Sequence, residues 1–155
     1  MTSANRIATL LLIVMFLANS GTGRADNLPM RKIAKGAMSG VREAKQEVIK
    51  TKSDWELFWS KHSVNQSAVT AIPDVDFGKE TVVAVIMGQQ RTGGFTIEII
   101  GVESEAEKLV ISIKRSSPPK GAMVIQALTT PFHIVAVPRS DLKPEFVEVK
   151  QTTPK

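Results

Sequence analysis

Side chains capable of nucleophilic or acid–base catalysis are sparse in this chain. It has two histidines, His62 and His133, and no cysteine. A catalytic serine or threonine needs a base beside it, usually histidine, and a third group that orients the base. His133 lies within an apolar run and His62 ends an aromatic stretch, so we expect both to be structural. The sequence therefore favours a protein that is not an enzyme.

Metal-binding residues do not gather at the spacing of a known kind of site. Zinc takes thiolate, imidazole and carboxylate ligands, whereas calcium takes several oxygen ligands. The histidines are far apart, and Asp74 and Asp76 are a pair of carboxylates without further oxygen ligands beside them. We expect no metal ion and no other cofactor.

One polar, glycine-rich segment is the most unusual part of the sequence. It consists of Gly88, Gln89, Gln90, Arg91, Thr92, Gly93, Gly94 and Phe95. Paired glycines allow positive φ and a tight reversal without a Cβ penalty. A run with strand alternation follows the segment, so the helix that a phosphate-binding loop requires is missing. Two interpretations stay open: a recognition loop that presents two glutamines and an arginine, or a plain hairpin turn.

A short helix is expected just before the middle of the chain. Ser53 and Glu56 have the spacing of a capping box, which predicts that the helix begins there. Trp55, Phe58, Trp59 and His62 follow at i, i+3, i+4 and i+7, which places them on one face. This face could form an aromatic ligand groove, but we favour a helix anchored on a sheet by its largest side chains.

The rest of the chain has the patterns of short strands. Residues 82–87 form an unbroken apolar run, as in a central strand covered on both faces. Alternation over residues 95–99 and 109–113 predicts a hairpin with an acidic connection at residues 103–107. Further strands are expected over residues 41–50, 123–128, 132–137 and 146–149.

These elements predict a mainly β fold of the α+β kind. We expect an antiparallel, twisted sheet of about 6–7 strands, folded into a small sandwich or open barrel, with one short N-terminal helix packed on it. A second helix of crossover length is missing, so parallel pairing is not expected.

The N-terminus has the layout of a secretory signal peptide over residues 1–25. A positive stretch ends at Arg6, an apolar run covers residues 7–18, and small residues precede a cleavage site after Ala25. The apolar run is shorter than the roughly 20 residues that span a bilayer. We expect a periplasmic or secreted protein without a membrane anchor, with a flexible lead-in at 26–38, a domain at 39–150 and a tail at 151–155.

Charge and composition argue against nucleic acid as a partner. The net charge is +5, and the basic residues are scattered singly or in pairs along the chain. Tyrosine, a common stacking platform for bases, is absent. Without cysteine there are no disulfides, so one packed core must stabilise the domain.

Several motifs in a fixed order carry a family resemblance. They are the Trp55 to Trp59 helix, Val75-Asp76-Phe77, the apolar strand, Gly88 to Gly93-Gly94-Phe95, Pro118 to Gly121, and Gln126-Ala127-Leu128-Thr129-Thr130-Pro131-Phe132-His133. Over about residues 40–138 the chain resembles the C-terminal domain of the protease complex subunit PrcB family.

The resemblance implies an exported, non-catalytic protein that associates with a secreted, subtilisin-like protease or its precursor and stabilises it. A partner that binds only the folded protease raises its stability by mass action. The residues expected to contact the partner are Gln89, Gln90, Arg91, Thr92, Gly93, Gly94 and Phe95, together with Thr130, Pro131 and His133.

Two alternative functions remain open from the sequence. A protease inhibitor would insert a loop such as residues 117–121 into the protease cleft. A small-ligand-binding domain would use the face formed by Trp55, Phe58 and Trp59.

Overall fold

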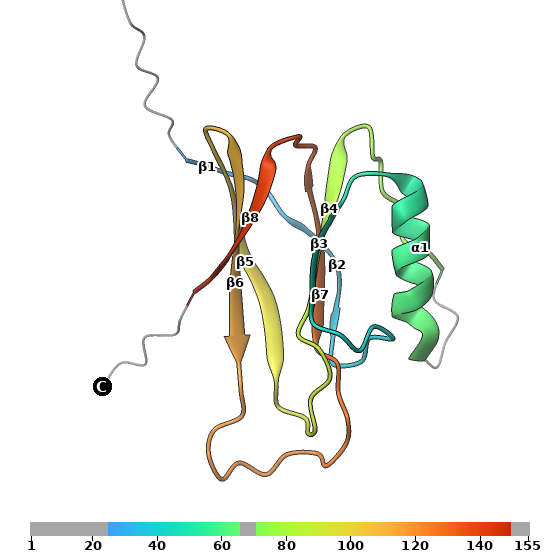
Figure 1. The fold of residues 1–155 in the computed structure, drawn as a ribbon, viewed down its shortest axis with the longest axis vertical. Coiled ribbons are helices and arrows are strands. Elements are labelled where there is room, and N and C mark those ends of the chain that lie inside the picture. Colours follow the sequence, from blue (N-terminus) through green and yellow to red (C-terminus); the bar gives the residue numbers. More distant parts are fainter. Residues whose placement is uncertain (1–24, 66–70, 150–155) are drawn as a thin grey trace, which may run out of the picture.

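The computed structural model describes residues 25–65 and 71–149. Two four-stranded sheets pack face to face, and one α-helix covers the outer face of one sheet (Figure 1). No helix in the described part of the chain is long and apolar enough to cross a membrane. The predicted signal peptide, apart from Ala25, and the predicted tail lie outside the described residues.

The two sheets differ in what covers them. The helix-covered sheet has the order β2 (Arg31–Gly36), β7 (Phe132–Pro138), β4 (Glu80–Ile86), β3 (Lys45–Ile49). The hairpin sheet has the order β1 (Asp26–Asn27), β5 (Thr96–Glu105), β6 (Lys108–Ser116), β8 (Lys143–Glu148). The helix α1 (Lys52–His62) is followed by a short 3-10 helix, η1 (Ser63–Asn65). The predicted mainly β fold with one helix is confirmed as a sandwich, with eight strands instead of six or seven.

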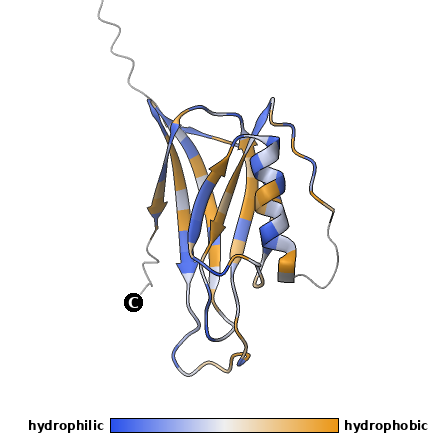
Figure 2. Cartoon of the chain, turned by 45° about the vertical axis from the view of Figure 1, so that its right-hand side comes forward, coloured by the Kyte–Doolittle hydropathy of each residue, from blue (hydrophilic) through white to orange (hydrophobic). Residues whose placement is uncertain are grey.

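The strand β4 is buried on both sides, as its unbroken apolar run predicts. Val82, Ala84 and Ile86 face the helix, and Val83 and Val85 face the hairpin sheet. The side chains of the neighbouring strand β7 likewise face either the helix or the hairpin sheet. The protein therefore has two apolar layers, one on each side of the helix-covered sheet. Figure 2 shows hydrophobic residues along the strands of the sandwich.

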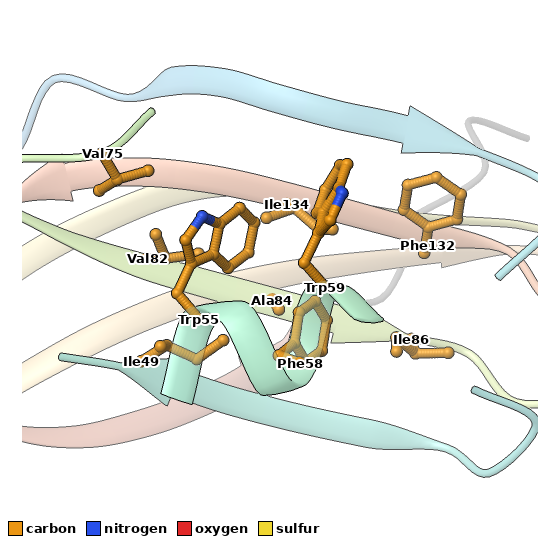
Figure 3. Packing of buried hydrophobic residues seen from close by; sticks show 10 residues of the cluster. All are labelled: Ile49, Trp55, Phe58, Trp59, Val75, Val82, Ala84, Ile86, Phe132 and Ile134. Carbon is orange, nitrogen blue, oxygen red and sulfur yellow. The ribbon is translucent and has the colours of Figure 1, made fainter. Parts of the chain in front are cut away.

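The helix packs its aromatic residues onto the sheet. Trp55, Phe58 and Trp59 lie over β4 and β7 (Figure 3). The predicted capping box at Ser53 is wrong, because the N-cap is Thr51. Thr51 Oγ1 accepts a hydrogen bond from the amide of Asp54 at 3.2 Å and donates one to its carboxylate at 2.6 Å. Thr51 and Asp54 have the same spacing as Ser53 and Glu56, and the helix is capped at this earlier pair.

The predicted flexible lead-in at residues 26–38 instead contains two strands. β1 pairs with the end of β5, and β2 pairs antiparallel with β7. Both are edge strands with mostly exposed side chains, and a register shift between Lys32 and Ala34 interrupts β2. An exposed, irregular edge strand lacks the alternation by which a strand is recognised in a sequence.

The expectation of purely antiparallel pairing is also wrong. β6 and β8 pair in parallel, with Lys108 opposite Lys143 and Ile113 opposite Glu148. The connection between them passes through β7 in the other sheet, which returns the chain to its starting end (Figure 1). The strand β7 therefore takes the place of the crossover helix that connects two parallel strands in a βαβ unit.

The strand predicted over residues 123–128 does not form. Residues 117–131 make a long loop between β6 and β7 instead. Prolines at 118, 119 and 131 remove backbone donors from both ends of this stretch. The loop extends past the end of both sheets, so its apolar residues find no strand to pair with (Figure 1).

Candidate functional site

Three loops meet at one end of the sandwich. They are residues 37–44 after β2, residues 88–95 after β4, and residues 117–131 after β6. Backbone hydrogen bonds join them: Gln89 N donates to Arg42 O at 2.8 Å, and Thr130 N donates to Ala37 O at 2.7 Å. We call these three loops together the loop end of the molecule.

The glycine-rich segment 88–95 is clamped to the long loop. Gln90 and Thr129 exchange two backbone hydrogen bonds of 2.7 and 3.0 Å, and Gly93 N donates to Ile125 O at 2.8 Å. Thr129 Oγ1 also donates to Thr92 O at 2.8 Å. Because β4 and β5 belong to different sheets, the segment is a connection between layers, and the hairpin-turn interpretation is wrong.

Close approach explains why glycine occupies position 94. Gly94 has φ +85°, and a Cβ there would lie 2.9 Å from Pro118 Cβ and 3.0 Å from Val124 Cγ1. Any larger residue would be strained and would push the two loops apart. The backbone of the loop end is therefore held in one arrangement despite having no regular secondary structure.

The predicted contact residues of this segment differ in accessibility. Gln89, Arg91 and Gly94 are exposed, whereas Gly93 is buried. The remaining three, Gln90, Thr92 and Phe95, are partly buried. The structure therefore leaves the side chains of Gln89 and Arg91 open to solvent.

The other predicted contact residues are buried supports. Thr130 Oγ1 donates to Ser39 O at 2.7 Å and accepts from Ser39 N at 3.0 Å. Pro131 is buried, and so is His133, whose Nδ1 accepts a hydrogen bond from Ile99 N at 2.9 Å. This bond joins β7 to β5 and thus one sheet to the other. Pro131 and His133 are therefore not open to a partner, whereas Thr130 lies at the base of a surface hollow.

Sequence reasoning missed the apolar residues of the loop end. Met123 is fully exposed, Ile125 is 75% exposed and Leu128 is 57% exposed. Met38, on the neighbouring loop, is about half exposed. The signal in the sequence was an apolar run enclosed by prolines, which cannot extend a strand ladder. Exposure of these residues creates an apolar surface on a fixed backbone.

The charged residues of the loop end are mainly basic and unpaired. Arg42, Arg91 and Lys120 accompany a single acid, Glu43, in the three loops. Elsewhere several of the described charges form pairs, such as Arg31 with Glu80 at 2.6 Å and Lys35 with Glu98 at 2.8 Å. Among the described residues no ion pair or hydrogen bond engages the side chains of Arg42, Arg91 or Lys120.

A hollow of about 230 Å³ is lined by residues of all three loops. Buried Thr129 and Thr130 form its floor. Its rim consists of Met38, Arg42, Gln89 and Leu128. The hollow therefore combines apolar side chains with hydrogen-bond donors.

The aromatic face of the helix is part of the core. Trp55 is 1% exposed, and its Nε1 donates to Pro73 O at 3.0 Å. Phe58 and Trp59 are also buried. The interpretation of a helix anchored by its aromatic side chains is confirmed, although Trp55 and Phe58 each also border a small surface hollow.

A serine and a histidine do meet in this fold, but in the interior. Ser39 Oγ and His62 Nδ1 lie 2.9 Å apart, and both residues are 0% exposed. Burial lowers the pKa of His62 to about 4. A substrate cannot reach this pair, so it contributes to packing. In the described part of the chain no three histidine, aspartate or glutamate side chains cluster as a metal site would require.

Comparison with family models finds a match over part of the chain. Residues 81–138 match the family model described as PrcB C-terminal. The matched stretch runs from β4 to β7 and includes two of the three loops of the loop end. No match was found among curated proteins or among solved structures. This match supports the predicted resemblance to the PrcB C-terminal family over residues 81–138.

Proposed function

We propose that this chain is an exported, non-catalytic accessory protein that binds a secreted protease, or the precursor of one, through its loop end. The observation that carries the binding surface is the exposure of Met123, Ile125 and Leu128 on a loop with a fixed backbone. Large exposed apolar patches on soluble proteins mark interaction sites, and interfaces are enriched in methionine and arginine. Arg91 and Arg42 lie in the same three loops.

The family supports the class of partner. Its name denotes a subunit of a protease complex, and two of the loops proposed to bind lie within the matched residues. The signal-peptide pattern at residues 1–25 supports export to the compartment in which a secreted protease folds.

The proposed mechanism is stabilisation by binding. A partner that recognises only the folded protease shifts its folding equilibrium toward the native state. A preformed binding surface favours this role, because little conformational entropy is lost when the loops are already ordered. The hydrogen bonds between residues 88–95 and residues 117–131 supply that order.

The test is capture of the partner from the native host. The full chain, with a C-terminal tag, is expressed there, the exported fraction is cross-linked, and co-purifying proteins are identified by mass spectrometry. We expect a secreted protease to dominate and its recovery to fall at least about tenfold in the double variant Met123→Ser, Ile125→Ser, as for the loss of interface anchors. Recovery of the chain alone, or equal recovery with the double variant, contradicts the proposal.

The activity of the captured protease separates binding from inhibition. An accessory subunit leaves the protease active and longer-lived, whereas an inhibitor that enters the cleft through residues 117–121 lowers hydrolysis of a peptide substrate. Inhibition that is relieved by a double change of Pro119 and Lys120 to glycine would replace the proposed role with the inhibitor role.

A further inference from the structure

We propose that the hollow at the loop end, rimmed by Met38, Arg42, Gln89 and Leu128, is a specificity subsite for a segment of the partner protein in which a carboxylate side chain lies beside an apolar one. This inference rests on the proposed function and names the chemistry by which the partner is recognised.

The floor of the hollow is rigid and has no free backbone donor. Thr129 N donates to Gln90 O at 3.0 Å, and Thr130 N donates to Ala37 O at 2.7 Å. The two threonine hydroxyls donate to Thr92 O and Ser39 O. Since these donors are used within the protein, recognition of a charged group falls to the side chains of the rim.

The polar part of the rim consists of donors. Gln89 N donates to Arg42 O at 2.8 Å, so the side chains of these two residues leave adjacent points of the backbone. The arginine carries five N–H donors in a planar fork, and the glutamine amide adds two. Among the described residues, neither side chain takes part in a hydrogen bond or ion pair, and a carboxylate is the group that an arginine fork binds best.

The electrostatic setting favours a negative occupant. Arg91 and Lys120 lie in the loops around the hollow, and Glu43 is the one acid in the three loops. A surface of one predominant sign attracts a partner of the opposite sign and repels competitors. An acidic segment therefore fits this end better than a basic or neutral one.

The apolar part of the rim defines the second half of the motif. Met38 and Leu128 stand on opposite loops, and about half of each side chain is exposed. Methionine adapts its shape to irregular apolar surfaces. A protein segment with an apolar residue next to its carboxylate covers both side chains, whereas nucleic acid and anionic lipid headgroups would satisfy the arginine and leave them exposed.

Selection from a random peptide library displayed on phage tests the subsite with the full chain as bait. We expect enriched peptides to carry aspartate or glutamate next to a leucine, isoleucine, methionine or phenylalanine. Binding of an enriched synthetic peptide should weaken about tenfold or more in Arg42→Gln and in Leu128→Ser, the loss typical of one charge-assisted contact. The matched controls Lys52→Gln and Leu57→Ser, on α1, should bind as the parent chain does.

Three results would overturn the subsite. One is selection of peptides without acidic residues, or of none; another is equal binding by Arg42→Gln. The third is binding of heparin or phosphatidylglycerol vesicles that competes with the peptide, since this would indicate a general anion surface. If Arg42→Gln also captures the protease normally while Met123→Ser, Ile125→Ser does not, the subsite fails and the proposed function stands.

Discussion

Large apolar side chains serve opposite purposes in two regions of this molecule. On the helix-covered sheet, Trp55 and Trp59 are buried, and the indole of Trp55 is fixed to a backbone carbonyl. At the loop end, Met123 and Ile125 face solvent on a loop that is held by backbone hydrogen bonds and by the hydroxyl groups of two threonines. The comparison shows that the aromatic residues, which look most like a binding site in the sequence, stabilise the fold, whereas an inconspicuous apolar run forms the candidate surface.

The strongest test of this contrast removes the largest buried side chain. Trp55→Ala should lower the free energy of unfolding by about 3–5 kcal/mol, because it leaves a cavity between α1 and the sheet. Urea denaturation followed by circular dichroism measures the change. Leu57→Ala, on the exposed side of the same helix, should change it by less than about 1 kcal/mol. Comparable losses in both variants would refute the assignment of Trp55 to the core.

A second test uses pH, since both histidines are buried and the loop end has none. Burial lowers the pKa of His62 from 6.5 to about 4, and burial is also the main cause that lowers the pKa of His133. The unfolded chain therefore binds more protons between pH 6.5 and pH 4, so stability falls as the pH falls. His62 alone accounts for about 3 kcal/mol across this window.

Unfolding by urea at several pH values measures this dependence. His62→Gln should be less stable than the parent chain at pH 7 but should lose less stability on acidification. An unchanged slope in the variant would show that His62 is not the group that titrates.

A third test separates backbone strain from loop contact within the loop end. Gly94 and Gly121 have nearly the same positive φ, +85° and +81°, but only Gly94 has neighbours at the position of a Cβ. Gly94→Ala should therefore cost about 1–3 kcal/mol more than Gly121→Ala, the extra cost of overpacking. Thermal unfolding compares the two variants, and equal effects would mean that the loops are not clamped together at Gly94.

The smallest stability effect is expected at the apolar surface itself. Met123→Ser, Ile125→Ser should change the free energy of unfolding by about 0.5 kcal/mol or less, because neither side chain is covered in the isolated protein. The same urea measurement applies. A loss comparable to that of Trp55→Ala would place these residues in the core of the fold.

Local sequence patterns predicted the elements that are buried in regular ways. The apolar run of β4, the hairpin of β5 and β6, and the aromatic face of α1 each follow from the period of a covered strand or helix. The edge strand β2 and the parallel pairing of β6 with β8 could not be predicted from such patterns, because their pairing depends on residues far away in the chain.

The candidate site was predicted only in part for the same reason. Residues 88–95 were singled out by their glycines, and the structure leaves Gln89 and Arg91 exposed there. His133 was expected at the surface of the site, but β7 is covered by the helix layer on one face and the hairpin sheet on the other. Met38 and Leu128 are distant in sequence and meet at one hollow, which no local pattern can reveal.

The most direct test of the account compares two leucines of equal exposure. Leu128 at the loop end and Leu57 on α1 are each 57% exposed, so Leu128→Ser and Leu57→Ser remove the same group from equally open positions. Each variant is expressed in the native host, and the cross-linked protease is quantified by mass spectrometry. We expect Leu128→Ser to recover several-fold less protease and Leu57→Ser to recover the parent amount. Equal recovery with both variants, or a loss confined to Leu57→Ser, would contradict the assignment of the loop end as the binding surface.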